Sequence, residues 1–512
     1  RRLPPVGTSL ADDVRNGLEA TLASTQKRLA KRANHPLAPD VEIFTSAVEL
    51  ALAHDEFYRD GDAALAMSLL EDAQARLDEL EDERSPWTTK RGTLVRGYRS
   101  HVDGSAQPYG LVIPKELNIS KTVPLYVWLH GGGDNKTNLA FLEERQTKVG
   151  QIAPDDAIVL HPFGRHCVGF KSAGEIDVLD ALEHVCANYN IDRRRIVLMG
   201  FSMGGAGCWH IGAHYADRFV AMSPGAGFAE TAQYQGLKQG DVPRYEAKLW
   251  GLYDVPCYTR NLFNLPVVAY SGELDKQIQA ARVMERAFAD EGRKLTHLIG
   301  PGMGHKYHPD TLADILARLK ASRDTGLNTD PDHVELQTRT LRYNKMHWVA
   351  VMGLGTHWQD ARVSAHRTDD DLLELETSNV TALRLSPADA RKITQMQIDG
   401  QKVKPFLQEI NGEATLSLVQ HDGRWEGGST DRNTPAKVSG LQGPIDDAFT
   451  EPFLIVLPTG KCRHAAVERW VDFESQHCID RWRALMRGSP RVKKDIDVTS
   501  EDIARYNLIL WG

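Results

Sequence analysis

One serine of this chain stands among glycines in a pattern that can expose its hydroxyl group. Gly200-Phe201-Ser202-Met203-Gly204 has the form G-x-S-x-G, and it directly follows the apolar run 195–199. A stretch with helical spacing, 205–215, comes next. A nucleophile on a sharp turn from strand to helix has strained backbone geometry, which glycine neighbours accommodate. The pattern therefore predicts that Ser202 is a catalytic nucleophile.

Two residues later in the chain can supply the other groups that a serine nucleophile needs. A base must take the hydroxyl proton, and an acid must orient that base. Asp275 and His305 each follow a predicted strand, and the carboxyl ends of strands are where sites of open α/β sheets collect. We expect His305 to be the base and Asp275 the acid. Glu273 is the alternative acid, and His308 is the alternative base.

A glycine-rich loop upstream is suited to binding a developing negative charge. His130-Gly131-Gly132-Gly133-Asp134 follows the apolar run 124–129, and such a loop turns backbone N–H groups toward an oxyanion. In an elbow of this type, a second donor is the N–H of the residue after the nucleophile. The expected oxyanion hole consists of Gly131, Gly132 and Met203. The candidates for the substrate pocket are His130, Asp134, Phe201 and Arg165.

The scaffold that must position these residues is predicted from the pattern of apolar runs. From residue 93 to residue 322, short apolar runs alternate with helical stretches, which is typical of a mainly parallel sheet with helices on both faces. The fold class is therefore α/β. The expected strands are 93–100, 109–113, 124–129, 157–161, 195–199, 265–270 and 295–299.

Three further regions flank this predicted catalytic domain. Residues 1–92 have apolar positions at helical spacing and are expected to form an N-terminal helical region. Residues 333–430 contain period-2 segments and the hairpin signal Ile398-Asp399-Gly400-Gln401, which predicts a small antiparallel β module. Residues 440–512 are expected to form an α/β unit, either the edge of a larger sheet or an incomplete piece. Its expected elements are a strand at 453–457, a helix at 464–486 and a strand at 507–511.

The motifs of residues 98–322 resemble those of the α/β-hydrolase superfamily. The likeness is greatest to multidomain bacterial proteins in the branch of feruloyl esterases, polyhydroxyalkanoate depolymerases and prolyl-oligopeptidase-like enzymes. The residues that carry it are 130–134, Gly164-Arg165, 174–177, 200–205 with Gly207 and Trp209, 272–275, and Gly304-His305. The resemblance implies a serine esterase that cleaves a carboxylic ester, of feruloyl or acetyl type, through an acyl-serine intermediate. We expect it to use no cofactor and no metal.

Two other functions fit the same sequence. A prolyl-oligopeptidase-like peptidase would use the same three residues, although such enzymes usually carry a β-propeller and the first 95 or so residues here have a helical pattern. The third interpretation is a carbohydrate- or partner-binding protein with a vestigial hydrolase domain. The motifs indicate the reaction class and leave the acyl group and the alcohol open.

The amino-acid composition limits the kinds of molecule that this protein is expected to bind. The 512 residues carry 61 Lys and Arg against 69 Asp and Glu, a net charge of -8, with no basic stripe for nucleic acid. No apolar run approaches the roughly 18 residues that a membrane span needs. The expected partner is a small-molecule or polymer-linked ester, and the oligomeric state is open. The chain starts at Arg1 without Met, which fits a fragment from which a targeting peptide was removed, so periplasmic or extracellular export is compatible with the sequence.

Overall fold

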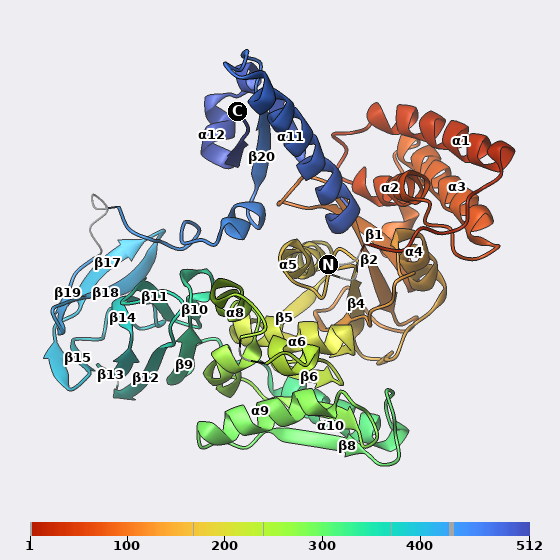
Figure 1. Ribbon diagram of the computed structural model, residues 1–512. Helices are drawn as coiled ribbons and strands as arrows, with labels where there is room; N and C mark the ends of the chain where they lie inside the picture. The colour runs from red at the N-terminus through yellow and green to blue at the C-terminus, as the bar shows by residue number, and fades with distance from the viewer. Residues whose placement is uncertain (1–2, 167, 239, 370, 430–434) are drawn as a thin grey trace. The chain divides into compact units, whose positions relative to one another are not determined.

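The chain divides into two compact units, whose helices and strands are labelled in Figure 1. A computed structural model describes residues 3–166, 168–238, 240–369, 371–429 and 435–512. The first unit is formed by Arg1–Asp192 together with Ala448–Gly512, and the second by Arg193–Asp447. The four-part domain division expected from the sequence stays a prediction.

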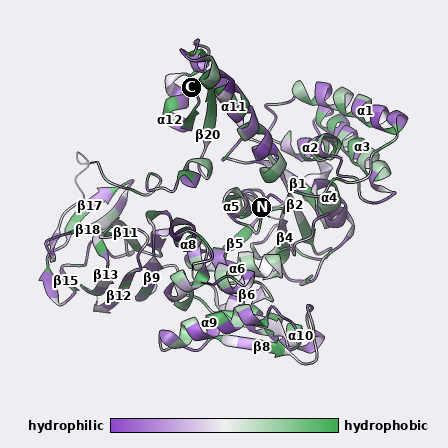
Figure 2. Ribbon diagram, in the orientation of Figure 1, coloured by the Kyte–Doolittle hydropathy of each residue, from purple (hydrophilic) through white to green (hydrophobic). Residues whose placement is uncertain are grey.

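The first unit begins with three helices that pack against one another. They are α1 (Asp12–Ala30), α2 (Pro39–His54) and α3 (Asp62–Glu81), where the sequence predicts a helical region. Figure 2 shows hydrophilic and hydrophobic residues alternating along α1, whose buried side chains include Leu18 and Leu22. Most residues of α2 are buried, because this helix packs against both other helices and against the neighbouring strands.

Four strands of the first unit follow the order β1-β2-β4-β3. They are β1 (Gly92–Arg99), β2 (Ala106–Ile113), β3 (Val123–Leu129) and β4 (Ile158–Pro162). β3 and β4 are parallel, and the other two pairs are antiparallel. Every residue of β2, β3 and β4 is buried, which explains their continuous apolar runs. The helices α4 (Asn138–Thr147) and α5 (Ala173–Asn188) pack against these strands.

The C-terminal segment adds a small parallel sheet to the first unit, in the order β21-β20-β22. Its elements are β20 (Phe453–Leu457), α11 (Ala465–Met486), β21 (Arg491–Lys494), α12 (Ser500–Arg505) and β22 (Asn507–Leu510). The sequence predicts β20, α11 and β22. It gives no signal for β21, because Arg491-Val492-Lys493-Lys494 is polar and contains no apolar run.

The second unit contains four parallel strands in the order β5-β6-β7-β8. They are β5 (Ile191–Phe201), β6 (Ala221–Gly225), β7 (Val268–Gly272) and β8 (Thr296–Gly300). The longer helices among them are α6 (Met203–His214), α9 (Ile278–Asp290) and α10 (Pro309–Thr325). The predicted fold class, α/β with mainly parallel strands and packed helices, is confirmed.

Two further sheets of the second unit form the β module. Their orders are β10-β11-β14-β18-β17, with β19 paired to β18, and β16-β15-β13-β12-β9. All strand pairs in these orders are antiparallel except β13 and β15, which are parallel. Asp399 and Gly400 both have positive φ, 50° and 78°, in the predicted hairpin turn between β15 and β16. The strands are β9 (His333–Thr338), β10 (Lys345–Met346), β11 (Val349–Leu354), β12 (Ala361–Asp369), β13 (Leu372–Ser378), β14 (Val380–Leu385), β15 (Gln395–Ile398), β16 (Gln401–Val403), β17 (Phe406–Ile410), β18 (Glu413–His421) and β19 (Arg424–Gly427).

A segment of short helices connects β6 to β7 and holds the β module. It contains α7 (Thr231–Gln235), α8 (Arg244–Trp250) and the 3-10 helix η3 (Val255–Phe263). Asn261 in η3 donates to the carbonyl of Ala213 in α6 and accepts from the backbone N–H of Gln337 in β9. One buried amide therefore joins α6, η3 and the module. The other 3-10 helices are η1 (Pro86–Thr89), η2 (Ala216–Arg218), η4 (Leu341–Tyr343), η5 (Ile445–Phe449) and η6 (Asp495–Asp497).

Two negative observations apply to the described residues alone. Within them, no helix combines the length and the hydropathy that crossing a bilayer requires. Cys208, Cys257, Cys462 and Cys478 are free thiols, and Cys167 lies outside the described residues.

Arg165 lies in a buried ion cluster. Its guanidinium is 2.7 Å from Asp103 and 3.2 Å from Asp177, and all three side chains are fully buried. Burial raises the pKa of Asp177 to about 6, while the two carboxylates raise the pKa of Arg165. Trp482 of α11 donates to Asp103, and Arg165 donates to the carbonyl of Met486. Arg165, a candidate for the substrate pocket, is thus paired with two buried acids. Its hydrogen bond to Met486 also connects the end of α11 to the loop after β4.

Replacing Arg165 with Met should lower the free energy of unfolding by about 3–5 kcal/mol, because two carboxylates would stay buried without their cation. The control is Arg318→Met, which removes a half-exposed pair with Asp314 and should change the value by less than about 0.5 kcal/mol. Urea unfolding followed by circular dichroism measures both. Equal shifts in the two variants would contradict a structural role for the cluster.

Candidate active site

Ser202 is the single residue between β5 and α6 and forms a sharp turn. Its backbone has φ 59° and ψ −120°, far from either neighbouring element. The turn is held by its N–H, which donates to the carbonyl of Gly225 at 2.9 Å. A Cβ on Gly205 would lie 2.1 Å from the same carbonyl oxygen, and one on Gly227 would lie 2.1 Å from the N–H of Ala206. Glycine at both places therefore allows α6 to approach β6 closely enough to form the turn.

The structure brings Ser202, His305 and Asp275 together. His305 Nε2 is 2.8 Å from Ser202 Oγ, and His305 Nδ1 is 2.7 Å from Asp275 Oδ2. The imidazole is 43% exposed, whereas the Asp275 side chain is 4% exposed. The chain of contacts thus leads from a buried carboxylate to a hydroxyl group that substrates could reach.

Close backbone contacts position the loops that carry Asp275 and His305. These loops follow β7 and β8, which are adjacent parallel strands. The N–H of Leu274 donates to the carbonyl of Met303 at 2.8 Å. A Cβ on Gly272 would lie 2.2 Å from the carbonyl oxygen of Gly304, so only glycine permits this spacing. The acid and the base are therefore fixed to each other through the main chain.

The alternative acid and base have other partners. Glu273 accepts a hydrogen bond from the N–H of Gly302 at 2.7 Å. The ring of His308 is 3.4 Å from the hydroxyl of Thr311. Asp275, in contrast, uses one carboxylate oxygen for His305 and accepts the N–H of Gln277 with the other.

The candidate pocket residue Phe201 and two tyrosines that the sequence did not single out, Tyr270 and Tyr307, form an aromatic cluster that supports the His305 loop. The ring of Phe201 lies 4.9 Å from His305 and 4.8 Å from Tyr307, between ring centroids. The hydroxyl of Tyr270 in β7 donates to the carbonyl of Lys306 and accepts from the N–H of His308, both at 2.8 Å. Tyr270 thus forms hydrogen bonds to the backbone on both sides of Tyr307. The sequence could have pointed to Tyr270 only through its position at the end of a predicted strand. A tyrosine in a strand, however, most often packs in the hydrophobic core.

The glycine-rich loop belongs to the first unit. His130 has Nδ1 2.9 Å from the carbonyl of Gly131 and Nε2 2.9 Å from the carbonyl of Phe163, and burial lowers its pKa. Its imidazole therefore contacts the backbone of the loop. Asp134 is exposed. Met203 is the first residue of α6 in the second unit. The assignment of Gly131, Gly132 and Met203 to an oxyanion hole stays a prediction.

The hydrogen-bond chain fixes what this arrangement can do chemically. A carboxylate at Asp275 accepts a hydrogen bond from Nδ1–H, so Nε2 of a neutral imidazole is left to accept the Ser202 proton. A serine so placed is activated for attack on an acyl or phosphonyl centre.

Comparison with solved structures finds serine hydrolases, both esterases and peptidases. A protein from Bacteroides ovatus described as a dipeptidyl aminopeptidase IV is 14% identical, over 48% of this chain and 37% of its own, with a TM-score of 0.36. A thermostable esterase is 20% identical, over 46% of this chain and 63% of its own, at 0.32. An S-formylglutathione hydrolase from Agrobacterium tumefaciens is 17% identical, over 46% and 96%, at 0.35.

The solved structures that match are thus serine hydrolases, the class that the sequence was predicted to resemble. They do not distinguish between the branches of that class. This chain spans well under two thirds of the Bacteroides protein and slightly under two thirds of the esterase. No protein-family model and no curated protein matches the sequence. With identities of 20% or less and TM-scores of 0.36 or less, the likeness does not indicate a substrate.

Tyr270→Phe should slow the covalent labelling of Ser202 by a fluorophosphonate about tenfold, because the His305 loop loses both hydrogen bonds of the hydroxyl. The rate constant of labelling is measured by mass spectrometry of the intact protein. Tyr506→Phe, far along the sequence in the first unit, serves as the control and should label at the wild-type rate. An unchanged labelling rate in Tyr270→Phe would show that the aromatic rings position the His305 loop without the hydroxyl of Tyr270.

Proposed function

We propose that this protein is a serine hydrolase that cleaves carboxylic esters through an acyl-serine intermediate. One observation carries the proposal: Ser202, at a strained turn after a parallel strand, is hydrogen-bonded to His305, which is hydrogen-bonded to Asp275. The same three side chains in the same contacts perform acyl transfer on several unrelated folds. Ser202 is the nucleophile, His305 the general base and then acid, and Asp275 the acid that orients the imidazole.

The reaction would proceed in two halves. Ser202 Oγ attacks the ester carbonyl carbon as its proton passes to His305 Nε2, and the oxyanion is bound by the backbone N–H groups of Gly131, Gly132 and Met203. Collapse of this intermediate breaks the bond to the alcohol, which takes the proton from His305. A water molecule then attacks the acyl-serine as it gives one proton to His305, and His305 returns that proton to Ser202 Oγ as the acid is released.

Ester and amide substrates would use the same residues, so the leaving group separates the esterase from the peptidase alternative. The test compares p-nitrophenyl esters of acetic and ferulic acid with a proline amide of p-nitroaniline. Faster turnover of the esters by kcat/KM supports the proposal. Preference for the amide favours a peptidase, and the absence of a fluorophosphonate adduct on Ser202 favours a vestigial domain.

Ser202→Ala should lower kcat on the preferred ester by about 10⁴ to 10⁶-fold, because the nucleophile is lost. Initial rates with p-nitrophenyl esters provide the measurement, and circular dichroism shows whether the variant is folded. A folded variant that keeps a tenth of the wild-type rate would overturn the assignment.

Asp275→Asn should lower kcat by about 10³ to 10⁴-fold, because an amide in place of the carboxylate favours the wrong imidazole tautomer. Glu273→Gln is the matched control. Its side-chain oxygen can still accept from the N–H of Gly302, and the rate should stay within about twofold of wild type. The reverse order of the two effects would assign the orienting acid to Glu273.

A further inference from the structure

The C-terminal sheet, β21-β20-β22, has two edges of opposite character. One outer strand, β21, has the sequence Arg491-Val492-Lys493-Lys494, and charged side chains of this kind prevent an edge from pairing with another strand. The other outer strand, β22, has the uncharged sequence Asn507-Leu508-Ile509-Leu510. Among the strands that the structure describes, β22 pairs with β20 alone. The outer side of β22, the β22 edge, can therefore accept a further strand.

The backbone groups at the β22 edge follow from the ladder on the other side of the strand. The N–H of Trp511, directly after β22, donates to the carbonyl of Val456 in β20 at 3.2 Å. Backbone groups alternate in direction along a strand, so the N–H and C=O groups of Leu508 and Leu510 point away from β20. The β22 edge thus offers two donors and two acceptors.

Helices cover both faces of this sheet. Phe453 and Val456 point to opposite faces of β20, because side chains alternate along a strand. Trp482 of α11 packs on Phe453, with 4.7 Å between the ring centroids. Lys493, in register with Val456, is 2.7 Å from Asp502 of α12. The two helices therefore lie on opposite sides of β20, as Figure 1 shows.

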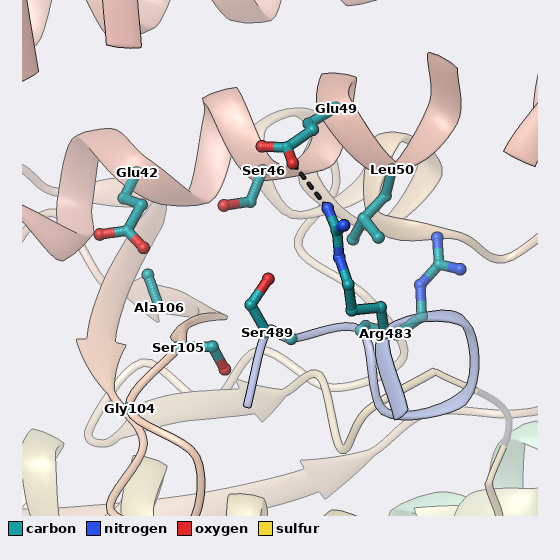
Figure 3. Close-up of a pocket in the computed structure, with 11 residues that line it drawn as sticks. Glu42, Ser46, Glu49, Leu50, Gly104, Ser105, Ala106, Arg483 and Ser489 are labelled. Carbon is teal, nitrogen blue, oxygen red and sulfur yellow. Dashed lines mark hydrogen bonds and ion pairs between the residues drawn. The ribbon is translucent and has the colours of Figure 1, made fainter. Parts of the chain in front are cut away.

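The C-terminal half of α11 is attached to the rest of the first unit. Figure 3 shows Arg483 extended toward Glu49 of α2, with which it forms an ion pair of 2.7 Å. The buried guanidinium of Arg487 donates to Glu56 at 2.8 Å. In contrast, every residue from 465 to 470 is exposed. The first turns of α11 are therefore accessible to a partner.

Large apolar side chains are exposed on both faces of the sheet. On the α11 face, Trp470 is 56% and Phe473 is 64% exposed, and the ring of Trp470 lies 6.3 Å from that of Trp511 in line with β22. On the α12 face, Leu510 of β22 is 71% exposed and Ile503 of α12 is 63% exposed. A single added strand would lie in the plane of the sheet and would not cover side chains on the helices. A partner that covers all of them must carry a helix on each face of its own strand.

We propose that the partner at the β22 edge is a second copy of this chain, paired β22 to β22 about a two-fold axis. A second copy brings its own α11 to one face and its own α12 to the other. With Ile509 opposite Ile509 of the second copy, Leu508 lies opposite Leu510, and these pairs exchange four hydrogen bonds in an antiparallel ladder. The six-stranded sheet ends in a charged β21 on each side, so the assembly stops at two copies. This pairing is independent of the proposed catalytic function.

The dimensions of this surface suit a dimer. Neighbouring strands are about 4.8 Å apart, so the two β20 strands, and the α11 helices packed on them, would be about 14 Å apart. Helices in direct contact are about 8–10 Å apart, and Trp470 and Phe473 of each copy can fill the remaining space. The four exposed side chains and the strand would bury about 600 Å² of each copy, or about 1,200 Å² in total, the low end of the range for specific interfaces. We therefore expect a dimer that dissociates on dilution.

The first experiment is sedimentation velocity of the full chain, diluted from about 50 µM to about 0.5 µM. Leu510→Lys should raise the Kd of the dimer more than about tenfold, because it places charges among apolar side chains. Ile496→Lys is the matched control. Ile496 is 75% exposed in η6, directly after β21, and its substitution should leave the Kd unchanged. Circular dichroism shows whether both variants are folded.

Disulfide crosslinking tests the register. Residue 509 would lie at the two-fold axis in a non-hydrogen-bonded pair, whose Cα atoms are about 4.5 Å apart, within the range for a disulfide. Ile509→Cys, in a chain that carries Cys462→Ser to remove an exposed thiol, should form a covalent dimer on oxidation. Leu508→Cys in the same chain is the control, because its Cα would lie about 8 Å from its counterpart, too far for a disulfide.

Three results would overturn the pairing. The chain could sediment as a monomer at about 50 µM, which would leave the β22 edge to a strand of another protein. Leu510→Lys and Ile496→Lys could have equal effects in folded variants, which would assign the dimer contact to another surface. Ile509→Cys could give no more covalent dimer than Leu508→Cys, which would exclude the two-fold register.

Discussion

The backbone of Ser202 adopts φ 59° and ψ −120°, a conformation that costs on the order of 1–3 kcal/mol for a residue with a side chain. It persists because β5 and α6 enter the turn from fixed directions and the N–H of Ser202 is bound by Gly225. The close approach of α6 to β6 requires a residue without a Cβ at Gly205 and at Gly227. A second close approach, between Gly272 and Gly304, fixes Asp275 relative to His305. Main-chain packing, more than side-chain adjustment, therefore sets the geometry of all three groups.

The flanking regions are held by a different kind of interaction. Arg165 and Arg487 are both fully buried and each is paired with carboxylates, one at Asp103 and Asp177, the other at Glu56. Buried pairs of this kind contribute little net stability compared with apolar packing, but breaking one is costly and its geometry is specific. They therefore determine where α11 lies on the first unit more strictly than the apolar contacts of the helix alone would.

The sequence predicts the parts of this structure that depend on local pattern. Continuous apolar runs identify β2, β3 and β4 because these strands are buried throughout, and β7 and β8 lead to the loops of Asp275 and His305. It misses β21, whose residues are polar, and it makes Arg165 a candidate for the substrate pocket without revealing that Asp103 and Asp177 are its buried partners. Arg487 and Glu56 are 431 residues apart, and no local spacing reveals such a pair. Local patterns in the sequence do not predict contacts between distant segments of the chain.

The two kinds of contact differ in how much substitution they tolerate. The loops of Asp275 and His305 are fixed by glycine contacts that leave no room for a Cβ, so a side chain introduced there would displace the backbone. Tyr58 and Arg59, in the turn before α3, are half-buried and exposed, and their side chains are held by the hydrogen bond of Tyr58 to Pro5 and by the ion pairs of Arg59 with Asp62 and Glu143. Substitutions at such positions usually cost little stability. The turn before α3 therefore tolerates changes of side chain that the glycine-fixed loops around Ser202 do not.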